Sequence, residues 1–139
     1  MNRLLCFVVT AVCAMSAVQA YAEVGFKSPT GNIVCLGDYD GTKGVECYIQ
    51  KVDKATSKKP KECQLDWGQL FFVSNVGKGQ VVCHGDVPAA LAYDSVQTLP
   101  YGKTIRGQGW RCTSQKTGMI CKNNKGSGFS LSRASQKVF

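Results

Sequence analysis

Six cysteines are spread through the body of this 139-residue chain, and they constrain its fold more than any other feature. Successive cysteines are separated by 11, 15, 19, 28 and 8 residues, so none forms a C-x-x-C pair. An even number of widely spaced cysteines is typical of an exported, disulfide-linked domain, whereas a structural zinc site needs closely spaced ligands. We therefore expect disulfides, no metal and no cofactor. The six are Cys35, Cys47, Cys63, Cys83, Cys112 and Cys121.

The first 22 residues have the three-part pattern of a secretory signal peptide. Arg3 supplies the positive charge, residues 4–18 are apolar, and the small residues Ala20 and Ala22 suit cleavage before residue 23. The apolar run is short for a membrane span, and an uncleaved anchor is the alternative. We expect export to the periplasm or beyond, with residues 23–139 as a single mature domain that has no transmembrane segment. The other two cysteines, Cys6 and Cys13, would leave with the signal peptide.

The mature chain is small and basic. Sixteen Lys and Arg oppose nine Asp and Glu after residue 22, which gives a net charge of +7. A domain of this size buries only about two-thirds of its extended surface, so its core is modest. Three crosslinks that close short loops would each destabilise the unfolded chain by ~3 kcal/mol. Their sum is comparable to the whole stability of such a domain, about 5–15 kcal/mol.

Short apolar runs separated by turn residues predict an all-β fold, a small disulfide-stabilised sandwich or barrel of short antiparallel strands. Residues 128–133 alternate cleanly between apolar and polar side chains, as a half-buried strand does. One helical turn is expected within Val87–Ser95. The eight expected strands are residues 24–26, 32–36, 44–49, 70–73, 80–83, 105–112, 119–121 and 128–133.

Two cysteine pairs are placed to crosslink hairpins. Cys35 and Cys47 lie on consecutive expected strands joined by residues 37–44, which are almost all turn formers. Cys112 and Cys121 flank a polar turn that ends in Gly118. Antiparallel neighbours bring Cα atoms within disulfide range. We predict these two bridges and, by elimination, one between the remaining two cysteines, while a crossed pairing such as Cys47 with Cys63 stays open.

Five lysines crowd residues 51–61, with only Asp53 opposing them inside that stretch. Such a cluster can attract an anionic envelope polymer or a membrane surface. The alternative, which we favour, is a solvated loop that discourages aggregation at a sheet edge. Nucleic acid is not expected as a partner of an exported chain. The lysines are Lys51, Lys54, Lys58, Lys59 and Lys61.

Aromatic and arginine side chains in or near turns form a second candidate contact surface. Aromatic rings on loops stack on sugars or pack into protein interfaces. They can equally fill the core, and for Trp110 we favour the core. The candidates for a shared binding face are Trp67, Tyr101, Trp110, Arg106 and Arg111.

The chain contains few combinations of residues that could act together in catalysis. His84 is the only histidine, so chemistry that needs a histidine pair is impossible. Acid–base work by His84 with Asp86, or by Asp66 with Arg106, is the remaining possibility. We favour a structural role for these residues, as turn caps and backbone partners, and we expect no enzymatic activity.

Five segments occur in a recognisable order: residues 26–35 (F-K-S-P-T-G-N-I-V-C), 63–68 (C-Q-L-D-W-G), 83–86 (C-H-G-D), 99–102 (L-P-Y-G) and 128–133 (G-F-S-L-S-R). Together they resemble a family of small exported bacterial proteins classed as a domain of unknown function. The resemblance covers nearly all of the mature chain. It implies a β-rich exported domain with paired cysteines, and it carries over no catalytic residue.

These features favour a non-enzymatic binding or interaction module of the cell envelope or secretome, with an anionic envelope polymer or another protein as its partner. One alternative is a periplasmic inhibitor of a host or rival enzyme. A net charge of +7 argues against a strongly basic target such as lysozyme, because like charges slow association. A second alternative is a small secreted hydrolase or nuclease-like toxin that uses His84.

Overall fold

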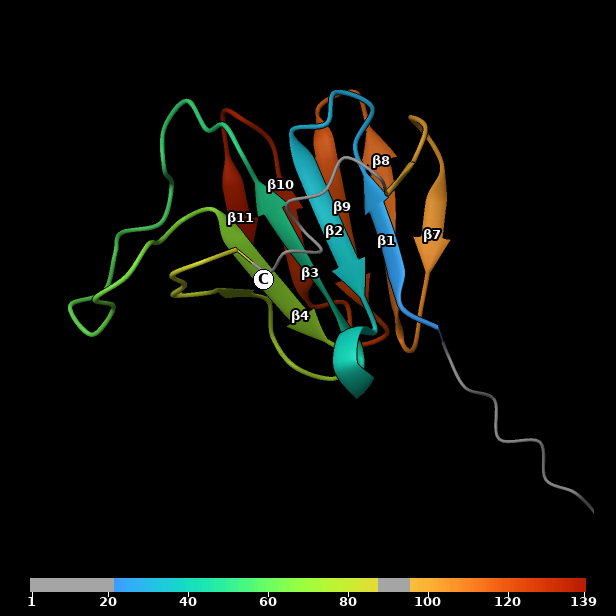
Figure 1. The fold of residues 1–139 in the computed structure, drawn as a ribbon, viewed down its shortest axis with the longest axis horizontal. Coiled ribbons are helices and arrows are strands. Elements are labelled where there is room, and N and C mark those ends of the chain that lie inside the picture. Colours follow the sequence, from blue (N-terminus) through green and yellow to red (C-terminus); the bar gives the residue numbers. More distant parts are fainter. Residues whose placement is uncertain (1–21, 88–95) are drawn as a thin grey trace, which may run out of the picture.

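The computed structural model describes residues 22–87 and 96–139, which form two β-sheets packed face to face (Figure 1). The predicted all-β fold is confirmed, and of the two expected forms, sandwich or barrel, the protein has the sandwich. A 3-10 turn, η1 (Tyr39–Gly41), is the one helical element of these ranges, and no helix in them is long and apolar enough to span a membrane. The strands are β1 (Val24–Lys27), β2 (Ile33–Gly37), β3 (Gly44–Ile49), β4 (Leu70–Ser74), β5 (Gln80–Val81), β6 (Gln97–Thr98), β7 (Thr104–Arg106), β8 (Trp110–Gln115), β9 (Gly118–Asn123), β10 (Gly128–Leu131) and β11 (Gln136–Val138).

Two predictions from the sequence fall on parts of the chain outside the described residues. The expected signal peptide covers residues 1–22, of which only the last is described. The expected helical turn within Val87–Ser95 falls almost wholly on residues 88–95.

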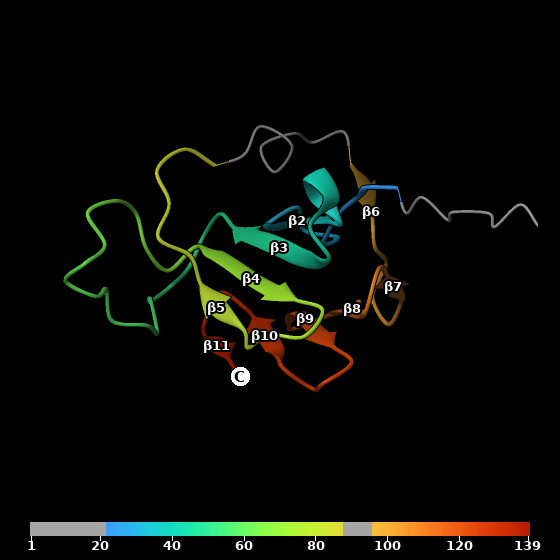
Figure 2. The ribbon, with the colours of Figure 1, turned by 90° about the horizontal axis from the view of Figure 1, so that it is seen from below.

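The first sheet has the order β5-β4-β3-β2-β1-β6, and the second has the order β11-β10-β9-β8-β7. Neighbours are antiparallel, except that β6 pairs with β1 in parallel. Figure 2 shows the two sheets as stacked layers. Most connections are short hairpins, so the turns gather at the two ends of the sandwich, where loops from both layers come close together.

Alternate side chains of each strand point between the sheets and form one core. Phe26 stacks on Trp110 with ring centroids 6.2 Å apart, and Phe71 meets Phe129 at 6.0 Å. Each pair joins a strand of one sheet to a strand of the other. The buried core cluster consists of Phe26, Ile33, Cys35, Val45, Cys47, Ile49, Phe71, Val73, Leu99, Trp110, Cys112, Met119, Cys121, Phe129 and Leu131.

The structure confirms the predicted disulfide pairing. Cys35 lies directly opposite Cys47 in the β2–β3 ladder, and Cys112 directly opposite Cys121 in the β8–β9 ladder. The Cα atoms of each bridge are 4.1 Å apart, as in the close, non-hydrogen-bonded pairs of an antiparallel sheet. The Cys47 and Cys121 sulfurs are 3.8 Å apart, so the two bridges meet in the core. The third bridge joins Cys63 to Cys83.

The single strand expected over residues 105–112 is instead the β7–β8 hairpin. Gly109 has a φ of 78°, which suits glycine and turns the chain back on itself. The Gly107 N–H donates to the Trp110 carbonyl at 3.0 Å and closes the turn. Two glycines within residues 107–109 are a turn signal, yet the sequence prediction placed one strand across them. It also missed β6 and β11, which have only two and three residues.

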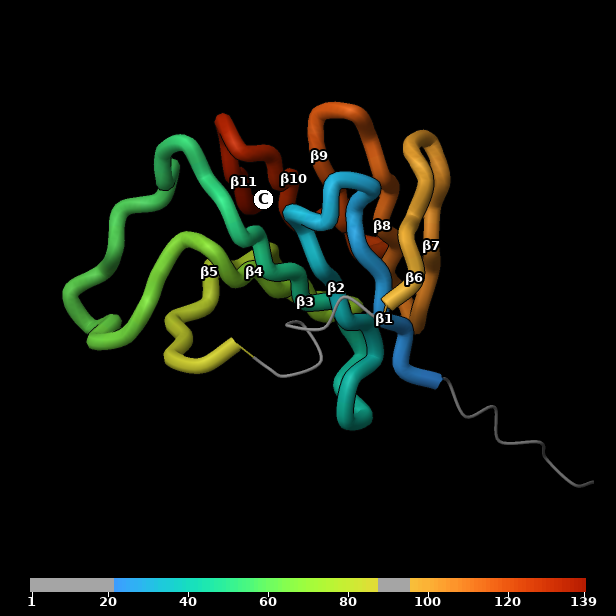
Figure 3. The backbone as a smooth tube through the Cα atoms, turned by 45° about the horizontal axis from the view of Figure 1, so that its top comes forward, coloured from blue at the N-terminus to red at the C-terminus, as the bar shows by residue number. Residues whose placement is uncertain are grey.

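Residues 50–69 leave the sandwich between β3 and β4 as a long excursion (Figure 3). Its first part is held to the second sheet, because the Asp53 N–H donates to the Arg133 carbonyl at 2.9 Å. Thr56 follows, its hydroxyl donating to the Gln136 carbonyl in a short hydrogen bond. Near its end, the Cys63–Cys83 bridge ties the excursion to the segment after β5. Three anchors therefore fix the lysine-rich segment to the body of the protein.

Candidate functional site

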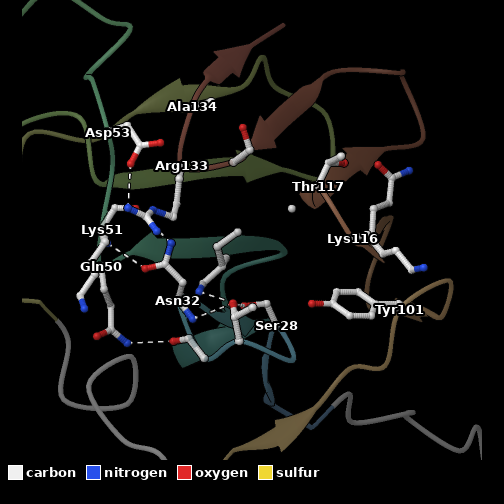
Figure 4. A pocket seen from close by; sticks show the side chains of 16 residues that line it. Ser28, Asn32, Gln50, Lys51, Asp53, Tyr101, Lys116, Thr117, Arg133 and Ala134 are labelled. Atoms are coloured by element: carbon white, nitrogen blue, oxygen red, sulfur yellow. Dashed lines mark hydrogen bonds and ion pairs between the residues drawn. The ribbon is translucent and has the colours of Figure 1, made fainter.

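A cleft of about 600 Å³ opens at one end of the sandwich, where loops of both sheets meet (Figure 4). The first sheet contributes the β1–β2 turn and the residues that follow β3. The second contributes Tyr101 before β7, the β8–β9 turn and the residues that follow β10. The lining consists of Ser28, Thr30, Gly31, Asn32, Ile33, Gln50, Lys51, Asp53, Tyr101, Gln115, Lys116, Thr117, Gly118, Ser132, Arg133 and Ala134.

One wall of the cleft extends the β2–β3 ladder with side-chain amides. The Asn32 side chain donates to the Lys51 carbonyl at 3.0 Å and accepts from the Lys51 N–H at 2.8 Å. The Gln50 side chain donates to the Gly31 carbonyl at 2.9 Å. These bonds act like strand pairing beyond the end of the sheet, so the wall is preorganised before any ligand arrives.

The base of this wall is the turn that begins at Ser28. Ser28 is buried, and its hydroxyl accepts from the Ile33 N–H at 3.1 Å. The same hydroxyl lies 3.2 Å from the Thr30 hydroxyl, which faces the cleft. A serine followed by Pro-Thr-Gly is typical of a tight turn, and Gly31 takes the left-handed conformation here with a φ of 73°.

The opposite wall is built from Tyr101 and the β8–β9 turn, which carries Lys116 and Thr117 (Figure 4). The Tyr101 turn rests on β8, because the Gly102 N–H donates to the Ser114 carbonyl at 2.7 Å. The Tyr101 side chain is 42% exposed. An aromatic ring on a fixed turn offers a flat surface to a ligand without a large loss of conformational entropy.

The third side of the cleft contains an ion pair between the two sheets. Arg133 lies after β10 and Asp53 after β3, and their side chains meet at 2.8 Å. Both are exposed, so the pair adds little stability by itself. The turn after β10 is fixed from below by the buried Gln136, whose amide donates to the carbonyls of Ser132 and Arg133.

This arrangement suits the binding of a polar ligand. The cleft offers amide groups, hydroxyls and one exposed ring, and Lys51 and Lys116 lie at its rim with their ammonium groups directed away from the hollow (Figure 4). Its lining has no cysteine and no histidine, and its one carboxylate, Asp53, is already paired with Arg133. The walls present hydrogen-bond donors and acceptors and positive charge, but no pair of groups set for proton transfer.

The proposed binding-face residues do not form one surface. Tyr101 lines the cleft, whereas Trp110 is 2% exposed and belongs to the core, the role favoured for it above. Arg106 and Arg111 lie side by side on β7 and β8, away from the cleft. Trp67 is partly buried in the segment before β4, and its Nε1 has no hydrogen-bond partner among the described residues.

Trp110 is a core residue because glycines make room for its ring. A Cβ on Gly37 or on Gly107 would lie 2.0 and 2.3 Å from ring atoms of Trp110, which no side chain tolerates. The Trp110 indole N–H donates to Asp38 Oδ1 at 2.8 Å. The ring is therefore enclosed by two backbones and satisfied by a buried carboxylate, which leaves no face of it for a ligand.

Only one of the five clustered lysines lies at the cleft. Lys51 lines it, while Lys54, Lys58, Lys59 and Lys61 are exposed along the excursion that leaves the sandwich. Asp53 is paired with Arg133 and not with a lysine. The four outer lysines are thus solvated on a loop, and only the first is near a concave surface.

The neighbourhood of His84 lies on the outer side of the first sheet. His84 is 7% exposed, its ring meets Tyr48 edge-on at 5.9 Å, and its Nδ1 lies 3.1 Å from the Gly85 carbonyl. Burial raises the pKa of the nearby Glu46 above its ordinary value of 4.5, and the charge of His84 opposes that rise. The hydrogen bonds and ion pairs of the described residues join neither His84 to Asp86 nor Asp66 to Arg106.

One group of potential metal ligands occurs in the described ranges, and disulfide formation occupies it. The sulfurs of Cys35, Cys47 and Cys121 lie within 4.8 Å of one another. Each of them is bonded to another cysteine, so none is a free thiolate for a metal ion.

Comparison with known families decides where the chain belongs. Residues 4–139 match DUF6636, a family of unknown function. The chain belongs to this family. No curated protein matches it, and no solved structure does either. In this DUF6636 chain, three of the segments quoted above for the family resemblance meet at the cleft: residues 28–33, Tyr101, and the Ser132–Arg133 pair.

Several residues that line the cleft could not be singled out from the sequence. Asn32, Gln50, Lys116 and Thr117 lie in ordinary turn or strand-end sequences, and none carries a catalytic or metal-binding pattern. The usable signal was the turn motif at residues 28–31, which indicates a fixed loop. Its meeting with four other segments depends on the sheet order, which the sequence analysis did not address.

Proposed function

We propose that this DUF6636 protein is an exported, non-enzymatic binding module of the cell envelope or secretome, and that it holds a short glycan segment in the cleft. The observation that carries the proposal is the meeting of five loop segments from both sheets around a preorganised hollow of about 600 Å³. Binding residues are commonly found on loops that a rigid scaffold positions. Three disulfides supply such a scaffold here.

The chemistry of the lining supports a sugar as the ligand. A sugar ring presents hydroxyls that donate and accept hydrogen bonds, and the cleft offers amides at Asn32 and Gln50 and hydroxyls at Thr30 and Thr117. Its less polar face would stack on the Tyr101 ring. Lys51 and Lys116 at the rim would attract a sugar that carries a carboxylate through the field of their charges, without a direct contact inside the hollow.

A hydrolase that depends on His84 has less support. The imidazole is buried, contacts the Gly85 carbonyl and belongs to a different part of the molecule from the cleft. If an activity were found and survived the His84→Ala substitution, that alternative would be eliminated.

Binding to the cleft is tested with a panel of neutral and acidic oligosaccharides of two to six sugars, by calorimetry on the oxidised protein. Tyr101→Ala should lower affinity about tenfold, the equivalent of ~1.4 kcal/mol. Tyr39→Ala is the matched control, because Tyr39 is 45% exposed and lies in η1, outside the cleft. Equal losses in both variants, or no binding by any member of the panel, would contradict the proposal.

Export is tested separately. The protein recovered from outside the cytoplasm of an expressing bacterium should begin at Glu23, and N-terminal sequencing measures this. Recovery of an intact Met1 in the cytoplasmic fraction would oppose export.

A further inference from the structure

The positive charge of this protein is concentrated in its second half. Residues 95–139 contain eight Lys or Arg and no Asp or Glu. Residues 23–94 contain eight Lys and nine Asp or Glu, so they are close to neutral. The second sheet, β7–β11, lies within the acid-free stretch. The second sheet and its turns therefore carry the net positive charge, with four of the eight cations on the strands themselves.

Strand register places three of these cations in one row. Arg106 pairs with Arg111 between β7 and β8, and Arg111 pairs with Lys122 between β8 and β9. Because Trp110, Cys112 and Cys121 are buried between the sheets, these intervening residues point outward. Neighbouring strands are ~4.8 Å apart, so the row extends about 10 Å across the sheet.

The surface beside this row is polar. The Thr104 and Thr113 hydroxyls share a hydrogen bond of 2.8 Å, and Ser130 pairs with Lys137 on the next strands. We call this outer side of the second sheet the cationic face. It consists of Thr104, Arg106, Arg111, Thr113, Ile120, Lys122, Ser130, Lys137 and Phe139.

The end of the face is held in place by backbone pairing. Phe139 and Gly128 exchange two hydrogen bonds of 2.8 and 2.9 Å. This pairing sets the Phe139 ring beside Lys122, whose ammonium lies 5.7 Å from the ring centroid. The aromatic ring of the face is therefore engaged with a cation, and Ile120 is the other large apolar side chain on it.

Like charges placed directly opposite each other destabilise a sheet. The one ion pair found in residues 22–87 and 96–139 joins Arg133 to Asp53, and it does not involve the cationic face. Three neighbouring cations without an acidic partner repel one another, and a bound polyanion would relieve that repulsion. The arrangement indicates an anionic partner outside this chain.

We propose that the cationic face binds an acidic polysaccharide. Arginine forks bind carboxylate or sulfate through two parallel hydrogen bonds, and the threonine and serine hydroxyls of the face match the hydroxyls of a sugar chain. A membrane-docking surface presents several apolar side chains for insertion, and a single-stranded nucleic acid site presents free rings for stacking. This face has two large apolar side chains, Ile120 and Phe139, and the Phe139 ring already contacts Lys122, so both of these alternatives have less support. The proposal is independent of the cleft, which shares none of these residues.

The test measures binding of the oxidised protein to polygalacturonate and to dextran sulfate at several salt concentrations. The triple variant Arg106→Gln, Arg111→Gln, Lys122→Gln should lose about 100-fold in affinity at low salt, since each cation near an anionic surface contributes roughly a fivefold factor. For this variant, the slope of log affinity against log salt concentration should be shallower than that of the parent protein by about 2 to 3.

The matched control is Lys54→Gln, Lys58→Gln, Lys59→Gln, which removes the same charge from the exposed excursion. It should change affinity less than about threefold if the face is the site. Equal losses in both triple variants would show that binding follows net charge and would overturn the proposal. So would a lack of binding to both polymers, or tighter binding to anionic vesicles or single-stranded DNA. Both variants should unfold at a midpoint no lower than that of the parent protein, which checks that they fold; the triple variant of the face should gain slightly, because it loses the repulsion between opposed cations.

Discussion

Asp38 joins the two sheets at the end of the sandwich opposite the cleft, and it does so with both carboxylate oxygens. Oδ1 accepts from the Trp110 indole at 2.8 Å, and Oδ2 accepts from the Gln108 N–H at 2.9 Å. Asp38 itself is buried and has a φ of 53°, in the left-handed region that aspartate tolerates better than most residues. One residue thus satisfies a core indole and fixes the β7–β8 turn.

We expect Asp38→Ala to lower the free energy of unfolding by about 2–4 kcal/mol, because it leaves buried donors unsatisfied. Asp40→Ala is the control, since Asp40 also has a positive φ, of 50°, but is exposed. Asp40→Ala should lower the free energy of unfolding only by the cost of a positive φ at a residue other than glycine, about 1 kcal/mol. Urea unfolding of both variants gives the comparison, and equal losses would mean that backbone strain, and not the buried hydrogen bonds, explains the role of Asp38.

Glu46 provides a prediction about pH. Burial raises its pKa above 4.5 in the folded protein, so the folded state holds the proton more tightly than the unfolded chain. This stabilising contribution is complete below the unfolded pKa and is lost as pH rises through the folded one. Once pH is above the folded pKa, the protein carries a charge at Glu46 that burial disfavours.

We expect Glu46→Gln to raise the free energy of unfolding at pH 7, by about 0.5 kcal/mol or less because solvent screens a partly exposed carboxylate. The gain should shrink as pH falls and vanish well below 4.5, where Glu46 is protonated in both states. The exposed Glu62→Gln is the control and should show no such pH dependence. A gain for Glu46→Gln that is constant from pH 4 to pH 7 would argue against an electrostatic origin.

Strands and their crosslinks define the next scale. The alternation in residues 128–133 and the turn residues between Cys35 and Cys47 were sufficient to predict β10 and the β2–β3 hairpin. The disulfide pairing followed, because a directly opposed antiparallel pair brings two Cα atoms within bonding range. These features are local in sequence, and local patterns predict them.

Elements that depend on distant contacts were not predictable in the same way. The turn between β7 and β8 exists because Gly107 packs against Trp110, and β6 exists because it lies beside β1. The two residues of β6 carry no signal of their own, and the glycines at 107 and 109 mark a turn without showing which strands it joins. The cleft belongs to this class as well, since Tyr101 and Asn32 meet there only after both sheets have formed.

The three disulfides should differ in how much each contributes to the free energy of unfolding. Chain entropy alone assigns ~3 kcal/mol to each bridge, with slightly more for the longer Cys63–Cys83 loop. However, Cys112 and Cys121 are fully buried, and their removal also creates a cavity. We expect Cys112→Ala with Cys121→Ala to cost at least 1 kcal/mol more than the Cys63, Cys83 double variant. Guanidinium unfolding measures this, and the reverse order would show that loop length outweighs core packing.

At the scale of the whole molecule, the two sheets share one core but differ in the surfaces that they present. Both share one core with two adjoining disulfides, which makes the sandwich a rigid support. The second sheet carries the cationic face on its outer side, and both sheets contribute loops to the cleft. Rigidity, a concave end and a charged face are the features on which the proposed binding role rests. Membership of DUF6636 is consistent with this account and adds no activity to it.

The central claim is that ligand binds at the loop end of this sandwich, and a map of backbone amide chemical shifts tests it most directly. The oxidised protein is titrated with the tightest-binding oligosaccharide of the panel. We expect the perturbed amides to cluster at residues 28–33, 50–53, 101–102, 115–118 and 132–134, with little change around His84. Perturbations centred on residues 82–87, or spread evenly over both sheets, would contradict the claim.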